Sequence, residues 1–118
     1  YLHDFCYHFC FKDIKGINFM WYCILATDYN DSLSLRQKHR PKHLLRIEEL
    51  QSQGRLLLAG PFPKIDSMEP GPNGFTGSLI VAEFNCLIDA KEWAEQDPFM
   101  LNGVYESINV KPFKKALP

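Results

Sequence analysis

His43 is the side chain best suited to acid–base chemistry, because an imidazole exchanges its proton near neutral pH. It stands two residues after Pro41, which suits the first turn of a helix, where the missing amide hydrogen costs nothing. At such a position the helix dipole, with Arg40 and Lys42, favours the neutral ring that a general base requires. On its own, the pattern is more typical of a helix-surface histidine without a role.

Asp66 is the expected partner of His43. It lies in a stretch of fifteen residues, 61–75, which holds four of the eight prolines and joins two predicted strands. A connection this long, with so little backbone freedom, indicates a purpose. A carboxylate bonded to the second ring nitrogen of His43 would fix its tautomer, so we expect Asp66 to orient it, with Asp28 as second choice. Asp66 is also typical of a turn aspartate that bonds its own backbone.

Four residues are candidates for substrate binding. Arg40 could anchor an anionic group, and Asp28, at the end of the first predicted strand, could form a wall of the site. The backbone of residues 74–78, including Gly77 and Ser78, could hydrogen-bond a developing oxyanion. A nucleophilic role for Ser78 is not expected, because no Gly-x-Ser-x-Gly elbow surrounds it.

The motifs indicate neither a metal nor a cofactor. His3, Cys6, His8 and Cys10 are side chains of the kinds that zinc prefers, but their spacing matches no zinc motif. The chain has no phosphate loop, dinucleotide fingerprint or His-Glu-x-x-His sequence.

Composition excludes several classes of partner and location. The net charge of −1 gives no electrostatic footprint for nucleic acid or an anionic membrane, and the longest apolar run, residues 56–59, is too short for a bilayer. No segment resembles a secretory signal, and four cysteines in no regular framework argue against a disulfide scaffold. We therefore expect a cytoplasmic protein.

Residues 1–19 differ from the rest, since they hold six of the sixteen aromatic residues and two of the four cysteines. The codons of Lys15 and Gly16 must read AARGGN, a purine-rich run that resembles a bacterial ribosome-binding site at a workable distance from Met20. We expect residues 1–19 to be a non-native or disordered extension produced by upstream translation, and residues 20–118 to form the single domain. A genuine N-terminal extension is the alternative.

The remaining pattern predicts six elements. Apolar runs favour strands at residues 21–27, 55–60, 77–84 and 104–110. Apolar residues at helical spacing favour helices at residues 41–54 and 85–97. The order β-α-β-β-α-β is the ferredoxin-like arrangement, an α+β fold whose antiparallel sheet carries two helices on one face.

That sheet would leave its second face uncovered. Trp21 and Tyr22 place aromatic rings on both sides of the first strand, and Ile108 and Val110 share a side of the last. Because a small sheet rarely exposes such a face to water, we expect a homodimer.

Several segments together resemble one family. They are RPKHLLRI (40–47), GRLLLAGP (54–61), GFTGS (74–78), WAEQDPF (93–99), GVYE (103–106) and VKPFKK (110–115). These segments resemble the YciI, or YCII-related, family in order from Met20 to about Lys115. The resemblance implies a ferredoxin-like fold of the dimeric α+β barrel type, with an active site around a histidine and an aspartate that match His43 and Asp66. Relatives include an enzyme that removes chloride from a chlorinated hydroxyhydroquinone, and the fold is shared with muconolactone isomerases.

Two functions follow as hypotheses. The first is a cofactor-independent enzyme of the dehydrochlorinase, isomerase or lyase kind, which uses His43 and Asp66 on a small cyclic or aromatic substrate. The second is a non-catalytic dimer that binds or senses a metabolite.

Overall fold

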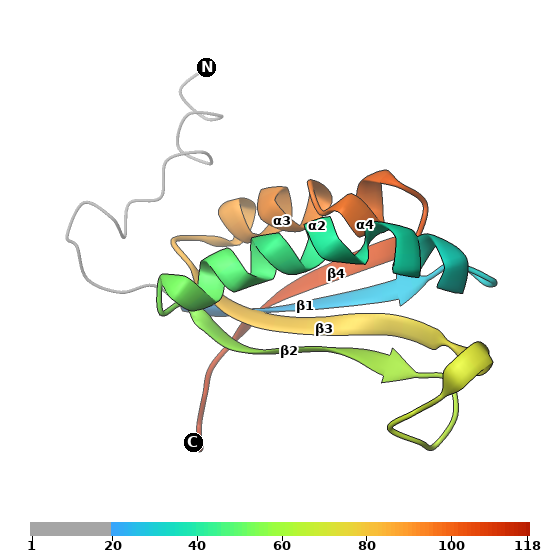
Figure 1. Cartoon of the computed structure of the whole chain (residues 1–118). Helices are drawn as coiled ribbons and strands as arrows, with labels where there is room; N and C mark the ends of the chain where they lie inside the picture. Colours follow the sequence, from blue (N-terminus) through green and yellow to red (C-terminus); the bar gives the residue numbers. More distant parts are fainter. Residues whose placement is uncertain (1–19) are drawn as a thin grey trace.

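The computed structural model describes residues 20–118, which form an α+β fold (Figure 1). The four strands are antiparallel throughout and lie side by side in the order β2-β3-β1-β4. This is the strand order of a ferredoxin-like fold, so the predicted fold class is confirmed. In chain order the elements are β1 (Met20–Asp28), α2 (Leu33–Ser52), β2 (Leu56–Pro63), η2 (Gly71–Asn73), β3 (Phe75–Phe84), α3 (Leu87–Glu95), α4 (Pro98–Leu101) and β4 (Tyr105–Phe113).

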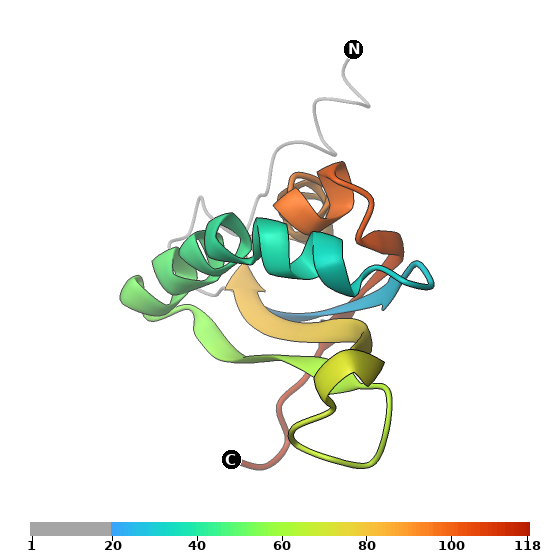
Figure 2. The same cartoon turned by 45° about the vertical axis from the view of Figure 1, so that its right-hand side comes forward.

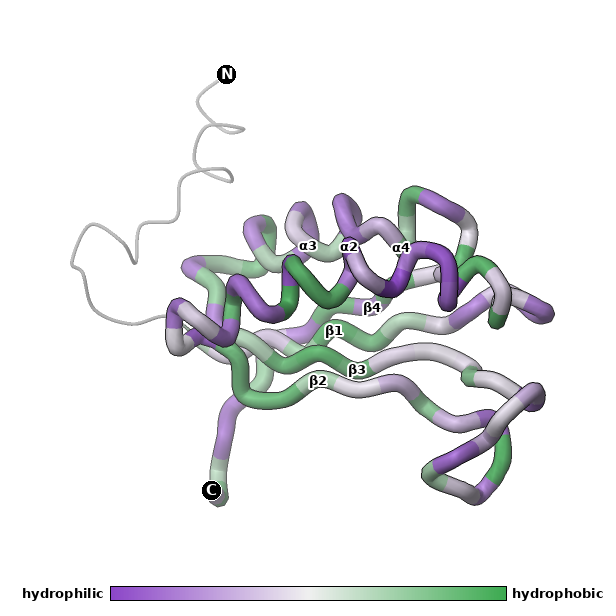
Figure 3. Tube along the Cα trace, viewed as in Figure 1, coloured by the Kyte–Doolittle hydropathy of each residue, from purple (hydrophilic) through white to green (hydrophobic). Residues whose placement is uncertain are grey.

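The three α-helices of residues 20–118, α2, α3 and α4, cover the same face of the sheet (Figures 1 and 2). Tyr22 and Ile24 of β1 point into the main core, where they meet Ile47 of α2 and Ala90 of α3. The apolar stretches of β1 and β3 run through the centre of the molecule (Figure 3). The alternation of buried and less buried residues along β1 is the period of two that a strand dictates.

Helix α2 begins earlier than the sequence predicted. It starts at Leu33, so Pro41 lies inside the helix and His43 lies in its third turn. The buried face of α2 is formed by Arg36, His43, Ile47 and Leu50, which recur at helical spacing. The prediction that His43 feels the positive end of the helix dipole is therefore wrong, because that effect fades within the first turn.

The long connection is shorter than predicted, because β2 continues to Pro63 and β3 already begins at Phe75. Prolines are tolerated in β2 because it is an edge strand of the sheet. The loop that remains, residues 64–74, is closed at its base by a hydrogen bond of 2.9 Å from the amide of Lys64 to the carbonyl of Gly74.

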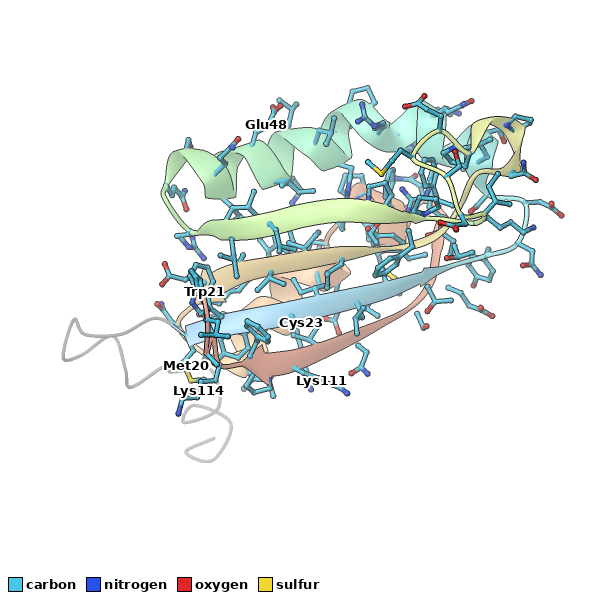
Figure 4. All side chains as sticks on the ribbon, turned by 90° about the horizontal axis from the view of Figure 1, so that it is seen from below. Met20, Trp21, Cys23, Glu48, Lys111 and Lys114 are labelled. Carbon is cyan, nitrogen blue, oxygen red and sulfur yellow. The ribbon has the colours of Figure 1, made fainter. Side chains whose placement is uncertain are left out.

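Two apolar residues of β4 face the helices. Ile108 and Val110 pack against the main core, so they are not part of the uncovered sheet face as the sequence suggested. The open face instead carries the exposed side chains of Leu25, Leu58 and Phe113, beside Cys23 (Figure 4). The homodimer stays a prediction, and these are the residues it would cover.

Two sequence-based expectations concern residues 1–19, which lie outside the described residues, and both stay predictions: the upstream-translation origin and the absence of a zinc site there. Within residues 20–118, no helix has the length and apolar character to cross a membrane. The same part of the chain contains no group of three His, Cys, Asp or Glu side chains that could hold a metal ion.

Candidate active site

His43 is paired with Asp97. Both carboxylate oxygens of Asp97 lie against Nδ1 of His43, at 2.8 and 2.9 Å, and both side chains are buried. Because a carboxylate can only accept, this contact makes Nδ1 the donor. In a ring that carries a single proton, Nε2 is then the acceptor. Nε2 makes no hydrogen bond with any described residue.

The short helix α4 holds Asp97 in place. Asp97 precedes the helix as its N-cap, and its Oδ1 accepts a hydrogen bond of 2.8 Å from the amide of Phe99. The ring of Phe99 stacks on His43 with a centroid distance of 3.9 Å and an angle of 12° between the planes. One turn of chain therefore supplies both the acceptor for Nδ1 and a flat surface under the imidazole.

The guanidinium of Arg46 also lies beside Asp97. Nη1 of Arg46 lies 4.0 Å from Oδ2 of Asp97, and the guanidinium lies over the ring of Trp93 at 4.4 Å. Burial lowers the pKa of Arg46, while the charges of Asp97 and Glu49 act against that shift. Asp97 thus lies between His43, which donates to it, and Arg46, whose charge is close but makes no hydrogen bond to it.

Arg36 is the centre of a neighbouring buried group. Its Nε and Nη2 donate to the two oxygens of Asp28 at 2.6 and 3.2 Å. Nη2 also donates to the carbonyl of Gly77 at 2.9 Å and to Oγ of Ser78 at 2.7 Å. The forked contact is the geometry that suits a guanidinium and a carboxylate, and it joins α2 to β1 and β3.

Gly77 is required where β3 passes β1. A Cβ atom on Gly77 would lie 2.0 Å from the carbonyl oxygen of Ala26, closer than any real contact. The strands can therefore approach, and the carbonyl of Gly77 can reach Arg36, only because this residue has no side chain.

A cavity of about 500 Å³ opens beside His43, between α2 and β2. We call it the His43 cavity. Its volume is in the range of small-molecule sites, and apolar residues form much of its lining. The lining includes Arg36, Arg40, His43, Ile47, Leu57, Ser78 and Phe99.

Tyr105 packs against His43 and Phe99 but does not line the His43 cavity. Its ring meets those of His43 and Phe99 edge to face, with centroid distances of 6.3 and 5.5 Å. Burial is the main cause that raises the pKa of Tyr105 well above its ordinary value of 10.0. The charges of Asp97 and Asp28 add to the rise, whereas Ser78 and Arg36 lower it. The phenol is therefore held neutral.

The structure does not bring Asp66 to His43. Asp66 is exposed and borders a separate hollow of the loop, whereas Nδ1 of His43 is occupied by Asp97. The expected pair is wrong for a geometric reason. Asp66 lies on the exposed loop that follows β2, whereas Asp97 lies in the turn before α4, and α4 packs against α2.

Two of the four residues predicted to bind substrate line the His43 cavity, and two do not. Arg40 and Ser78 line the His43 cavity, and their role in substrate binding stays a prediction. Asp28 and Gly77 do not line it, and both are partners of Arg36 instead. The suggestion that backbone amides of residues 74–78 receive an oxyanion is also wrong for the part within β3, because that strand is paired on both sides and its amides serve the sheet.

Sequence reasoning missed Asp97 and Arg36. The pair Asp97-Pro98 was interpreted only as the end of a helix, although an aspartate before a proline is also a good N-cap for the next one. Arg36 was missed because the helix was expected to begin at Pro41. A start at Leu33 would have placed Arg36, His43 and Ile47 on one face.

Comparison with known proteins gives a consistent result. The family model of the YCII-related domain matches residues 20–114. Protein YciI of Escherichia coli O6:H1 is 53% identical over 97 residues, which are 82% of this chain and 99% of that protein. A protein of Haemophilus influenzae is 49% identical over the same length and shares of each chain.

One solved structure is similar over most of its length. The 5-chloro-2-hydroxyhydroquinone dehydrochlorinase of Burkholderia phenoliruptrix, in complex with 2,5-dihydroxybenzoquinone, aligns with a TM-score of 0.71. The alignment covers 80% of this chain and 94% of that one, at 24% identity. At this identity the likeness shows a shared fold.

Proposed function

This chain belongs to the YCII-related family, and we propose that it is an enzyme in which His43 moves a proton on a small cyclic or aromatic substrate. The observation that carries the proposal is the pair formed by His43 and Asp97 at the side of a cavity. Nδ1 is committed to a buried carboxylate, while Nε2 is free of hydrogen bonds to the described residues. A histidine held in this way has one nitrogen left for a substrate.

The proposed step is a proton abstraction. Nε2 of His43 takes a proton from the substrate, and Nδ1 keeps its hydrogen bond to Asp97, whose negative charge stabilises the imidazolium that forms. The electron pair released from the substrate then expels a leaving group or moves a double bond. This is the chemistry of the lyase or isomerase that the sequence suggested, with Asp97 in the position expected for Asp66.

Two cavity residues have supporting roles in this proposal. Arg40 makes no ion pair within residues 20–118, so its charge is available to an anionic substrate. Oγ of Ser78 already accepts from Arg36, so its own hydrogen can be donated to a developing oxyanion. Asp28 and Gly77 would act only through Arg36.

The 5-chloro-2-hydroxyhydroquinone dehydrochlorinase with the same fold supports the proposed substrate class, because the 2,5-dihydroxybenzoquinone bound in its structure is a small ring compound. The homodimer and the cytoplasmic location belong to the proposal as well. The exposed apolar residues of the open sheet face, Leu25, Leu58 and Phe113, support a second copy as its cover.

The test is a screen of small ring compounds, each measured for turnover and for binding. With an active compound, His43→Ala is expected to abolish the reaction while binding persists. Unchanged turnover in that variant would remove the proposed base. Binding without turnover across the screen would favour the alternative, a dimer that binds or senses a metabolite.

A further inference from the structure

The His43 cavity adjoins a second cavity of about 330 Å³. We call it the Met68 cavity. It shares Arg36, Arg40, Pro61 and Phe99 with the His43 cavity, so these four residues form the passage between them. The residues that belong to the Met68 cavity alone are the apolar Leu33, Met68, Pro70 and Phe75, together with Gln37, Glu69 and Gly71.

Positive charge is concentrated at the passage. Arg36 and Arg40 are one helical turn apart on α2, and both line the two cavities. Arg36 uses Nε and Nη2 for its bonds to the protein, but its Nη1 makes no hydrogen bond with a described residue and is not sealed from solvent. The rings of Phe75 and Phe99 lie 5.3 and 4.9 Å from its guanidinium carbon. Because Asp28 balances the charge of Arg36, the four passage residues carry about one free positive charge, that of Arg40. Two carboxylates line the cavities outside the passage, Glu48 in the His43 cavity and Glu69 in the Met68 cavity.

The Met68 cavity has an ordered wall. The loop of residues 64–74 carries hydrogen bonds of its own, from the amide of Asn73 to Pro70 and from the amide of Gly74 to Gly71. Pro70 is buried although the loop lies at the surface. The loop is thus built as a compact unit that can bound a binding site.

We propose that the Met68 cavity is a subsite of the same cleft and that the substrate is a carboxylate with two arms. The carboxylate lies at the passage, between Arg40 and Nη1 of Arg36. One arm, which reacts, points to His43, and the other, which is apolar, lies between Met68 and Phe75. The inference rests on the proposed function for the first arm only, because the second arm is recognised by binding alone.

Two probe acids test the proposal on the full chain. 3-Phenylpropanoate has one arm, and 2-benzyl-3-phenylpropanoate has two identical arms on the carbon that bears the carboxylate. Dissociation constants are measured by NMR titration. We expect the two-armed acid to bind at least about tenfold more tightly, because it buries a second ring.

Variants on the exposed surface of α2 then locate the second arm. Gln37→Trp fills the Met68 cavity and is expected to remove the gain while leaving the one-armed acid within about twofold of the wild type. Lys38→Trp, the control, adds the same ring to a neighbouring residue that lines neither cavity and is expected to keep the gain. Arg40→Gln is expected to weaken both acids by the same factor.

Equal affinity of the two acids, or a gain that survives Gln37→Trp, would overturn the proposal. Failure of the proposed enzyme function gives a different result. In that case the affinities follow the expected pattern and no compound is turned over, since neither probe depends on proton transfer by His43.

Discussion

Asp97 accepts hydrogen bonds from two directions, from Nδ1 of His43 at 2.8 Å and from the amide of Phe99 at 2.8 Å. The same carboxylate therefore orients His43, the candidate base, and caps the start of α4. Phe99 of that helix in turn stacks on the ring of His43. The orientation of His43 and the start of α4 thus both depend on the side chain of Asp97.

Asp97→Asn is expected to lower turnover by on the order of 10²- to 10⁴-fold, because a neutral amide no longer fixes the tautomer or stabilises the imidazolium. The free energy of unfolding is expected to fall by about 1–3 kcal/mol, since buried hydrogen bonds are weakened. Urea unfolding gives the second quantity without a substrate. Asp66→Asn is the matched control, and an equal loss of turnover in it would restore Asp66 as the orienting residue.

Asp28→Asn is expected to destabilise the fold by about 3–5 kcal/mol, because Arg36 would keep a buried charge without its partner. The double variant Arg36→Met with Asp28→Leu is expected to recover part of the loss, since neither charge remains. Chemical denaturation of the wild type, the single variants Asp28→Leu and Arg36→Met, and their double variant measures the coupling between the two residues. Asp31→Asn, on the exposed turn that follows β1, serves as the control. Additive losses in the double variant would contradict the pairing.

Gly77→Ala is expected to cost about 2–3 kcal/mol or more, because the new Cβ would clash with the backbone carbonyl of Ala26, which cannot move alone. Gly60→Ala gives the comparison, since no atom lies within 4 Å of the Cβ that it would add. Thermal unfolding of both variants checks the prediction. Similar midpoints for the two would show that β1 does not constrain residue 77.

The buried phenol of Tyr105 is expected to lower the free energy of unfolding at alkaline pH. Its folded pKa is raised above the ordinary value of 10.0, mainly by burial, so above about pH 10 the native state keeps a proton that the unfolded chain has lost. The free energy of unfolding then falls by about 1.4 kcal/mol for each pH unit from this group, while below pH 10 its contribution is constant.

Urea unfolding at pH 8 to 11.5 of the wild type and of Tyr105→Phe measures this effect. The variant, which has no phenol to ionise, is expected to show a shallower alkaline decline. Tyr29→Phe, at an exposed position, is the control that keeps the wild-type decline. Parallel curves for the wild type and Tyr105→Phe would contradict the assignment.

Local pattern was a reliable guide where one element depends on its own residues. The strand at Met20–Asp28 and the helix at Leu87–Glu95 follow from apolar runs and helical spacing, and both lie close to the predicted ranges. The family segments led to His43, Arg40 and Ser78, which all line the cavity. Two boundaries predicted at prolines are wrong. Pro41 lies inside α2 and does not begin it, and Pro61 lies inside β2 and does not begin the loop.

The order of elements, the family and the histidine at the cavity could be predicted from the sequence, since periodicity and motifs are properties of neighbouring residues. The acid that meets this histidine depends instead on how distant segments pack. Asp97 is 54 positions from His43 and Asp66 is far nearer along the chain, yet packing of α4 on α2 brings Asp97 into contact. Distance along a chain says little about distance in space once helices pack on a sheet, and partners of buried charges are chosen by that packing.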